Sequence, residues 1–456
     1  MKLHRSNFSQ PLSIKVAQLL LLSLCTSFLS AEPADTNRQI EEDTISRDKT
    51  IPYVKSYPKE DFLTGDWGGG RSKLHEAGID LGLSYTAEPA ALLSGGYDEG
   101  SSTYLHNINL EFKADLEKLA GWKNSSFLAK FSSRHGDNLS ELYVAPGSTP
   151  DGAYIYGEYF NKSQEVYGGQ TTKLVNFQLT TQIHDKVSID VGRLVMNDFF
   201  LRSDIYCDFM SNSTCGAPKG IFTPYALSAY PDATMGLHAN IEIIEDLHLH
   251  AAIFDGGWTK QDPNGFDWEL GLNGVAYTGE LQYILQGGAT YGEKRVIKVG
   301  VNHHTGDFDN FITGEIESGN TSYYVLADIG VYSEGEGTDQ GLSLFGSYVY
   351  NENDEIAGLT NFYNIGMVYK GLIPGRDIDK FGINFVYAKH SEFNTYTHDY
   401  VSGLMRGNES ILEISYNYYL PYGIQLMPDF QYIKHPNGSV DFDDAMIAGL
   451  KFNVNF

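Results

Sequence analysis

From Ile79 to the end of the chain, apolar and polar residues tend to alternate. Successive side chains of a strand point to opposite faces of a sheet, so this period predicts strands with one apolar and one polar face. In segment 103–117, the apolar face holds Tyr104, Ile108, Leu110, Phe112, Ala114 and Leu116, and the polar face holds Asn107, Asn109, Glu111 and Lys113. In the last segment, 444–456, the residues from Met446 to Phe456 alternate in the same way, with Ile447 as the one apolar residue on their polar face.

Sixteen segments carry this alternation or a strong β composition. In chain order they are 79–93, 103–117, 125–135, 171–183, 187–195, 233–244, 247–255, 273–285, 295–303, 322–331, 340–350, 361–370, 380–391, 410–420, 422–433 and 444–456. The connections between them are longer and shorter in turn. A soluble β-sandwich has no reason to place every long connection at one end, whereas a transmembrane β-barrel does. An all-β, antiparallel transmembrane barrel of about sixteen strands is therefore expected.

The N-terminal part of the chain, before Ile79, lacks this alternation. Residues 1–31 have a basic start and an apolar run that ends in small residues, which is typical of a secretory signal peptide cut after Ala31. Residues 32–62 are polar and carry three prolines, and we expect a flexible periplasmic leader. Residues 63–456 are expected to form the barrel domain, and a short helix over 71–77, which Gly78 would stop, lies at its start before the first strand.

The net charge of the chain and the length of its apolar runs exclude some classes of function. The chain of 456 residues has a formal net charge of −26, and loss of the three basic residues of the signal peptide would make it −29. An acidic chain is unlike a nucleic-acid-binding protein. No segment after the signal peptide offers roughly 18 consecutive apolar residues, so no transmembrane helix is expected.

Two cysteines remain after the signal peptide, Cys207 and Cys215. In an exported protein, this spacing predicts a local loop disulfide, with two free thiols as the alternative. Signatures of a serine nucleophile, a phosphate-binding loop, a zinc-protease helix or a dinucleotide fingerprint are absent. We therefore expect no enzyme and no resident cofactor.

His248 and His250 share the polar face of 247–255, but no third ligand is visible in the sequence, so no metal site is expected there. Whether calcium binds an outer loop, for example at Asp307-Phe308-Asp309, stays open.

Three stretches together resemble the carbohydrate-selective porin family, the OprB-type outer-membrane porins. The first is Leu-Thr-Gly-Asp-Trp-Gly-Gly-Gly-Arg at 63–71. The second is Val-Gly-Arg-Leu at 191–194, which leads into Asp198-Phe199-Phe200. The third runs from Glu-Ile-Ser-Tyr at 413–416 through Gln-Leu-Met-Pro-Asp-Phe-Gln-Tyr at 425–432 to the final Phe456. A weaker match is Leu-Ile-Pro-Gly-Arg at 372–376.

This resemblance implies a sixteen-stranded barrel in a bacterial outer membrane that passes mono- or oligosaccharides by diffusion. It implies outer-membrane lipid and lipopolysaccharide as surroundings, and barrel assembly machinery that reads Phe456. A homo-oligomer is compatible with it. By analogy with general porins, the third outer loop, 196–232, is expected to fold into the lumen.

Candidate pore-lining residues follow from strand parity and from this loop. The resemblance suggests a narrow point built from Arg134, Glu111 and the aromatic Trp258. Strand parity places Lys130 and Asn109 on the same inward faces, near Arg134 and Glu111. The remaining candidates are Arg193, Asp198, Arg202, Glu413, Asp429 and Gln431. Arg193 has the parity of its apolar neighbours, so either a bulge turns it inward or it extends along the outer rim.

Two other functions remain open at this point. A general or ion-selective diffusion porin would use the same fold. A secreted, soluble, β-rich sugar-binding protein is the alternative from another class. Fractionation with outer membranes and heat-modifiable migration on a gel would exclude the soluble alternative.

Overall fold

The computed structural model describes residues 62–146, 160–166, 171–222, 228–257, 263–286, 295–335, 338–393 and 407–456. The expected signal peptide and all but the last residue of the expected leader lie outside these residues. So do Trp258 and parts of the expected loops 136–170 and 196–232.

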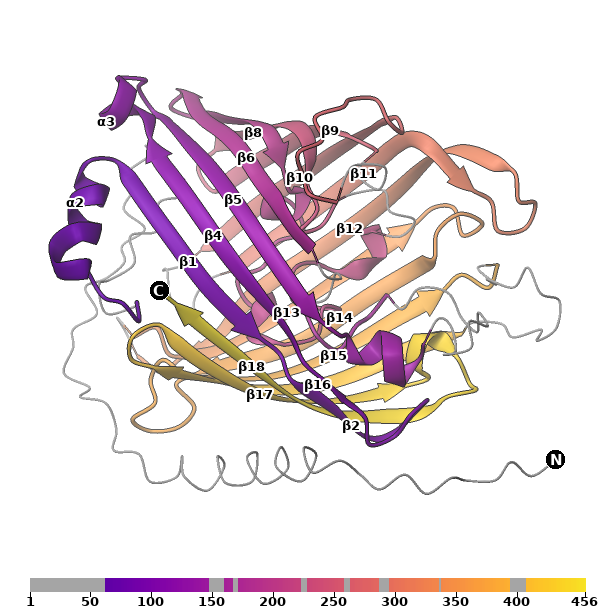
Figure 1. Cartoon of the computed structure of the whole chain (residues 1–456). Coiled ribbons are helices and arrows are strands. Elements are labelled where there is room, and N and C mark those ends of the chain that lie inside the picture. Colours follow the sequence, from indigo (N-terminus) through magenta and orange to yellow (C-terminus); the bar gives the residue numbers. More distant parts are fainter. Residues whose placement is uncertain are drawn as a thin grey trace, which may run out of the picture.

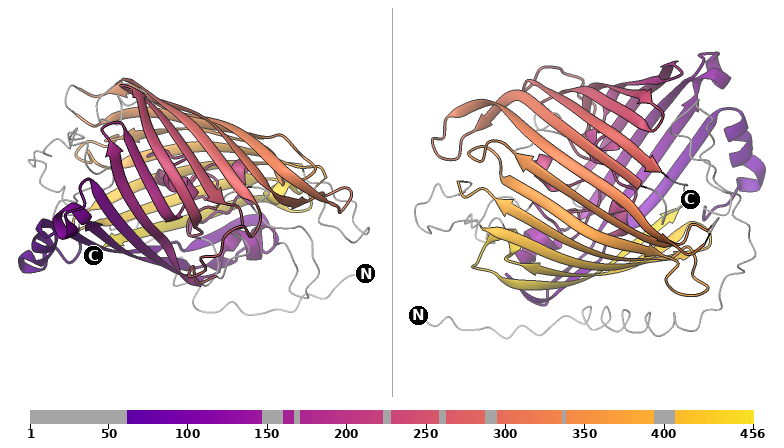
Figure 2. Two further views of the ribbon diagram at one scale, coloured as in Figure 1. Left: turned by 90° about the horizontal axis from the view of Figure 1, so that it is seen from above. Right: turned by 180° about the vertical axis from the view of Figure 1, so that it is seen from behind.

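The strands of the described residues form one antiparallel sheet that closes on itself (Figure 1, Figure 2). Their bounds are β1 Ile79–Ala87, β2 Ala90–Gly96, β3 Ser102–Thr103, β4 Leu105–Asp115, β5 Ser125–Gly136, β6 Thr171–His184, β7 Val187–Leu194, β8 Thr234–Ile244, β9 Leu247–Asp255, β10 Val275–Gln286, β11 Arg295–Asp309, β12 Ile316–Ser333, β13 Gly341–Asn351, β14 Leu359–Lys370, β15 Lys380–His390, β16 Asn408–Leu420, β17 Ile424–Lys434 and β18 Asp443–Asn455. Short breaks separate β1 from β2 and β3 from β4, so the wall consists of sixteen spanning strands. The predicted barrel is confirmed.

The last strand closes the barrel. β18 pairs with β17 on one side and with β1 and β2 on the other, for example Ser84 opposite Asn455 and Ala90 opposite Gly449. Neighbouring strands follow one another along the chain around the rest of the wall. No strand edge therefore remains unpaired along the length of this seam.

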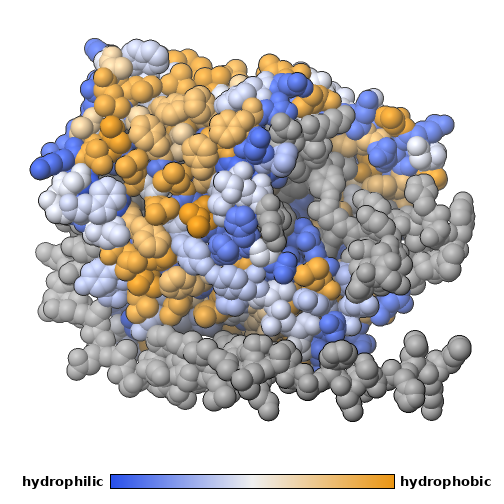
Figure 3. All heavy atoms as spheres, in the orientation of Figure 1, coloured by the Kyte–Doolittle hydropathy of each residue, from blue (hydrophilic) through white to orange (hydrophobic). Residues whose placement is uncertain are grey.

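The outer face of the wall is apolar, as the alternation predicts. Leu110 is 49% exposed, whereas Asn107, on the opposite face of the same strand, is 3% exposed. Figure 3 shows apolar side chains gathered over β1, β4 and β5. An exposed apolar band around a barrel with a polar interior fits lipid outside and water inside. No helix in the described residues is long and apolar enough to cross a membrane.

Helices are short and lie at the ends of strands or in loops. Their bounds are η3 Trp67–Gly69, α2 Gly70–Glu76, α3 Leu116–Ala120, η4 Ser140–Val144, η5 Met196–Asp198, η6 Tyr206–Asp208, η7 Lys219–Phe222 and η9 Pro436–Gly438. The predicted N-terminal helix is confirmed as α2. Helix α3 corrects the sequence prediction, which placed Leu116 in a strand: Asp115 caps α3 by accepting from the backbone N–H groups of Glu117 and Lys118.

The hairpin of β11 and β12 is longer than predicted. Both strands extend several residues past the expected ends, and Asp307 lies opposite Ser318 in this extension. Burial still alternates along β11 to Asp309. Most residues of this extension are polar, with Phe308 and Ile316 as exceptions, so no regular apolar period marked it as a strand in the sequence.

The chain end is held by the segment before β1. The N–H of Leu63 donates to the carbonyl of Asn455 at 2.8 Å, and the Arg71 guanidinium donates to the carbonyl of Phe456 at 2.7 Å. The N–H of Phe456 donates to the carbonyl of Leu83. C terminus and α2 therefore lie at the same end of the barrel (Figure 1).

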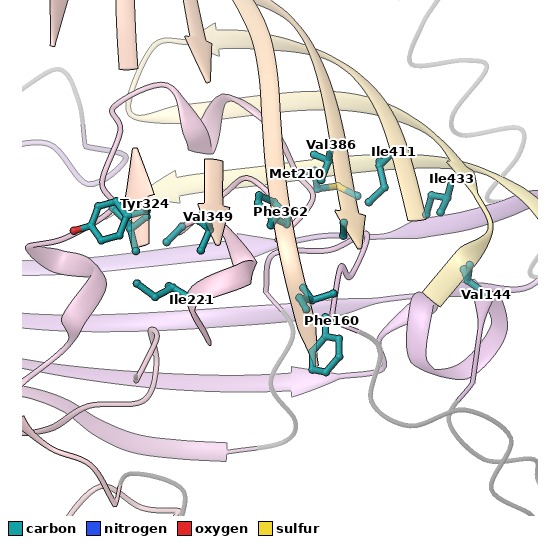
Figure 4. Close-up of a cluster of buried hydrophobic side chains, with 14 of the residues drawn as sticks. Val144, Phe160, Met210, Ile221, Tyr324, Val349, Phe362, Val386, Ile411 and Ile433 are labelled. Carbon is teal, nitrogen blue, oxygen red and sulfur yellow. The ribbon is translucent and has the colours of Figure 1, made fainter. Parts of the chain in front are cut away.

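Loop L3 comprises residues 195–233, and its described parts, 195–222 and 228–233, fold into the barrel and pack against the wall opposite β7 and β8. Figure 4 shows Ile221 of L3 beside Val349 of β13, and Met210 of L3 near Val386 and Ile411. The predicted disulfide between Cys207 and Cys215 is present within this loop. Part of loop L2, residues 137–170, also lies inside: Phe160 belongs to the same apolar cluster. Ile447, the apolar exception on the polar face of β18, is fully buried in it.

Candidate functional site

The lumen wall at β4 and β5 carries a row of charged side chains. Glu111 and Lys130 are cross-strand partners, and their side chains form an ion pair of 3.0 Å. Lys113 contacts the other oxygen of Glu111 at 3.2 Å. Directly opposite residues share a face, so the alternation along each strand places these groups toward the lumen.

Tyr230 of L3 faces this row. The Lys130 ammonium lies 4.8 Å from the centroid of the Tyr230 ring, and the Arg134 guanidinium lies 4.7 Å from it. The Tyr230 hydroxyl donates to the side-chain oxygen of Asn109. Cations over an aromatic ring stabilise its position. The half-buried ring is thereby fixed between L3 and the wall.

A second set of charges continues from Arg134 to the seam of the barrel. Arg134 lies 3.9 Å from Glu165 of L2, and Lys451 of β18 lies 3.5 Å from the same carboxylate. Lys451 also pairs with Glu88 at 3.3 Å. Burial acts to raise the pKa of Glu165, but Lys451 and Arg134 outweigh burial, and the pKa of Glu165 lies below its usual value.

Asp198 is the carboxylate at the start of L3. It accepts a hydrogen bond of 3.0 Å from the side-chain amide of Asn176. Burial raises the pKa of Asp198 above its ordinary value, although the nearby Lys130 acts in the opposite direction. Both loops and the wall thus contribute ionisable groups to one region of the lumen. We call this region the constriction, because a narrow point is expected at Arg134 and Glu111.

L3 is fastened to the far wall by hydrogen bonds and ion pairs. One oxygen of Glu413 accepts from the backbone N–H groups of Met210 and Ser211, each at 2.8 Å. Lys380 pairs with Asp208 at 2.8 Å. These contacts hold the disulfide-closed tip of L3 against β15 and β16.

The candidates predicted from the sequence therefore fall into separate places. Arg134, Glu111, Lys130, Asn109 and Asp198 lie together at the constriction. Arg134 pairs with Glu165 rather than with Glu111, and Lys130 takes the place beside Glu111.

Three candidates on the far wall lie under the inward loops. Glu413, Asp429 and Gln431 face inward but are buried, because L3 and L2 cover them. Arg202 is an exposed residue of L3, and its carbonyl accepts from Lys298. Trp258 lies outside the described residues.

Arg193 lies on the outer face of the wall. Its cross-strand partner Phe177 is 45% exposed on the apolar side. The Arg193 guanidinium donates to the carbonyls of Leu174 and Asp267, at 3.2 and 3.3 Å. Asp267 belongs to loop L4, residues 256–274, and the part of L4 over 263–268 lies against the outside of the barrel, where Trp268 contacts Phe177. The structure thus places Arg193 away from the constriction, under L4.

Sequence reasoning missed two of the groups that complete the constriction, Glu165 and Glu88. Glu165 has no strand period around it that could orient it. Glu88 precedes Pro89, and this pair interrupts an otherwise continuous strand, so its position at a wall irregularity was a signal that could have been read.

Comparisons with known proteins agree with this architecture. A family model described as the carbohydrate-selective porin, OprB family, matches residues 99–456. Porin B of Pseudomonas aeruginosa is 27% identical over 433 residues, covering 88% of this chain and 92% of that protein. A putative porin, QuiX, of Acinetobacter baylyi is 25% identical over 425 residues, covering 87% and 93%. The high-pH structure of Pseudomonas putida OprB has a TM-score of 0.79 at 25% identity, covering 88% of this chain and 99% of that one. The chain belongs to the OprB family of carbohydrate-selective porins.

Proposed function

We propose that this protein lets sugars diffuse passively across the outer membrane through the constriction between L3, L2 and β4–β5. The observation that carries the proposal is the half-buried Tyr230 ring held between Lys130 and Arg134, beside the Glu111 carboxylate. Aromatic rings offer a flat apolar face to a sugar ring, and charged side chains offer donors and acceptors to its hydroxyl groups. A channel must also bind weakly enough to release its solute.

The pairing of charges favours neutral solutes over ions. Lys130 pairs with Glu111, and both Arg134 and Lys451 lie beside Glu165. Each cation at the constriction thus has a carboxylate partner, so the local field has no single sign that would select ions. A general or ion-selective porin on this fold is the second candidate. A soluble sugar-binding protein is not supported, because an apolar outer wall requires lipid around it.

The test compares solutes of matched size in liposome swelling. The wild-type protein should admit glucose and maltodextrins faster than amino acids of similar size. Arg134→Ala and Glu111→Gln should each reduce this preference, because each removes hydrogen-bonding groups from the constriction. Lys73→Ala, on the exposed side of α2, is the control and should behave as wild type. Unchanged ratios in both variants would refute the role of these two residues, and equal wild-type rates would favour the general porin.

The cellular context is part of the proposal. The signal peptide over 1–31 would direct export and be cleaved, the leader over 32–62 would lie in the periplasm, and 63–456 would be the barrel domain. Outer-membrane lipid and lipopolysaccharide would surround the apolar band, and assembly machinery would read Phe456. Assembly into a homo-oligomer is compatible with this arrangement and is tested by sedimentation in detergent.

A further inference from the structure

Arg193 is a charged side chain on the outer face of the barrel wall. Val191 lies two positions before it on the same face of β7 and is paired with Leu237 of β8, which is paired in turn with Ile253 of β9. These three apolar side chains are exposed, so their row belongs to the band that faces lipid. An arginine in contact with lipid is costly, yet only 2% of Arg193 is exposed. Loop L4 covers Arg193 from the outside.

Two hydrogen bonds join L4 to the wall at this place. The Arg193 guanidinium donates to the carbonyl of Asp267 at 3.3 Å, and the N–H of Leu174 on β6 donates to the carbonyl of Asn264 at 3.0 Å. Gly265 has a φ of 74°, and a Cβ at this position would lie 2.1 Å from the carbonyl oxygen of Leu174. Glycine alone permits so close an approach. The backbone of L4 therefore lies directly on the outer face of the wall.

Further backbone groups of L4 are bonded within the loop. The N–H of Phe266 donates to the side-chain oxygen of Asn264, and the N–H of Glu269 donates to the Asp267 carboxylate, each at 2.9 Å. A loop in water can leave such groups to the solvent, whereas a segment at the depth of the acyl chains must bond them to protein. These hydrogen bonds suit a segment that lies in the membrane.

L4 also exposes three large apolar side chains at alternate positions. Phe266, Trp268 and Leu270 are 56%, 43% and 69% exposed. The Trp268 ring packs edge-on against Phe177 of the wall, with ring centroids 5.5 Å apart. Tryptophan is typical of the level at which acyl chains meet headgroups. The exposed Glu269 fits the same level, because a carboxylate there reaches water.

We infer that residues 263–270 of L4 lie in the outer leaflet of the membrane, with Phe266, Trp268 and Leu270 against the acyl chains of lipid. Acyl chains fit this surface because it continues the exposed apolar row of β7, β8 and β9 directly beside it. Arg193 holds L4 in place, and L4 shields Arg193 from lipid in return. The inference rests on the outer-membrane location of the barrel and does not depend on which solute the channel passes.

The test uses the fluorescence of Trp268 in the full-length protein, reconstituted in phosphatidylcholine vesicles. The other three tryptophans are replaced, as Trp67→Phe, Trp122→Phe and Trp258→Phe, so that Trp268 alone emits. Its emission should be quenched by lipids that are brominated along their acyl chains and should be protected from aqueous iodide. Quenching by iodide without quenching by brominated lipid would place L4 in water and overturn the inference.

Two reference positions calibrate this measurement in a protein that also carries Trp268→Phe. Leu237→Trp, on the outer face of β8, should be quenched by brominated lipid. Ile312→Trp, in the exposed turn between β11 and β12, should be quenched by iodide. Protection of Trp268 from both quenchers would assign this face of L4 to a second copy of the chain instead of lipid. Protection of Leu237→Trp from brominated lipid would refute the membrane location of the barrel itself, and the inference with it.

Two glycines of L4 provide a matched pair of variants. Gly265 and Gly271 have similar positive φ angles, 74° and 77°, but nothing lies within 4 Å of a Cβ built at Gly271. Gly265→Ala should therefore push L4 off the wall, so that Trp268 loses quenching by brominated lipid and gains quenching by iodide. Gly271→Ala has a comparable backbone strain without the clash and should leave both unchanged. Equal quenching of Trp268 in the two variants would contradict the placement of L4 against the wall.

Discussion

Tyr230 of L3 is held by the barrel wall at the place where we propose that solutes pass. Its hydroxyl donates to Asn109 and its ring lies against two cations, so its conformation is fixed before any sugar arrives. A preorganised group loses little entropy when a solute binds. At the residue scale, the side chains of the constriction are held by hydrogen bonds and ion pairs, as Tyr230 is.

The first prediction concerns this ring. Tyr230→Ala should lower the preference for glucose over a non-sugar of equal size by about two- to tenfold, since aromatic contacts contribute about 0.5–1.5 kcal/mol. Tyr230→Phe keeps the ring and should retain most of the preference. Liposome swelling rates for the two variants decide the point, and equal losses in both would assign the effect to the hydroxyl instead.

The second prediction concerns Asp198 and pH. Because burial raises the pKa of Asp198, the carboxylate should take up a proton at a higher pH than an ordinary Asp, whose pKa is about 4. As pH falls from neutral through the raised pKa of Asp198, the constriction loses one negative charge. The preference of the channel for anions over cations should therefore rise. The raised pKa of Asp198 also makes the stability of the protein depend on pH. The stabilisation linked to protonated Asp198 is fully present below the pKa of the unfolded chain and is lost as pH rises through the folded pKa.

Reversal potentials in planar bilayers measure this change. Asp198→Asn should show at neutral pH the anion preference that wild type reaches only in acid. Glu165 should not contribute in this window, because its pKa is lowered and it stays ionised. Burial raises the pKa of Glu88 to about 7, so Glu88→Gln is measured in parallel to separate its titration from that of Asp198. A wild-type profile that survives in Asp198→Asn would assign the titration to another group.

At the scale of elements, L3 has the largest effect on the lumen. It leaves the wall after β7, crosses the barrel and packs on β13–β18, where apolar side chains of both partners are buried. The inner faces of these strands therefore carry apolar residues that a water-filled wall would not need, such as Ile447 and Met427.

The third prediction tests this packing. A side chain at Gly220 of L3 would contact Cβ atoms of Phe362 and Val349 at 3.0 Å. Gly220→Val should therefore overpack the contact, at a cost of about 1–3 kcal/mol that L3 can relieve by moving toward the lumen. Swelling rates should fall, and more for maltodextrins than for glucose.

A substitution at an open position is the control for that experiment. Nothing lies within 4 Å of a Cβ built at Gly279, on the outer face of β10. Gly279→Val should leave rates unchanged. Faster maltodextrin entry in Gly220→Val would show that L3 detaches from the wall instead of shifting inward.

The same scale shows what a sequence can and cannot predict. Strand number, the closing pair and the lumen side of Glu111 and Lys130 followed from a two-residue period, because parity is a local property of extended backbone. The course of L3 and L2 could not follow, since contacts such as Glu413 with Met210 join positions far apart without any period. The extended β11–β12 hairpin was missed because its outer part is mostly polar and carries no regular apolar period.

For the whole molecule, closure of the sheet depends on a small set of contacts at one seam. The fourth prediction is that Arg71→Ala lowers the temperature at which the barrel becomes heat-modified on a gel. Arg71 donates to the terminal Phe456 carbonyl and lies 3.8 Å from the Phe62 ring centroid, and a hydrogen bond from a charged group contributes on the order of 1.5–3 kcal/mol. Lys73→Ala on the same helix is the control, and an equal decrease in both would attribute the effect to α2 as a whole.

The attachment of L3 to the last strands has a consequence for biogenesis. The contact between Glu413 and the tip of L3 joins residues 203 positions apart, and contacts of such long range form late in folding. The Cys207–Cys215 bond spans eight positions and needs no wall to form. In an incompletely closed barrel, L3 would thus already contain its disulfide but would lack its contacts with the last strands. Such a barrel would let large solutes pass. Completion of β16–β18 is then the folding step at which the channel becomes selective for solute size.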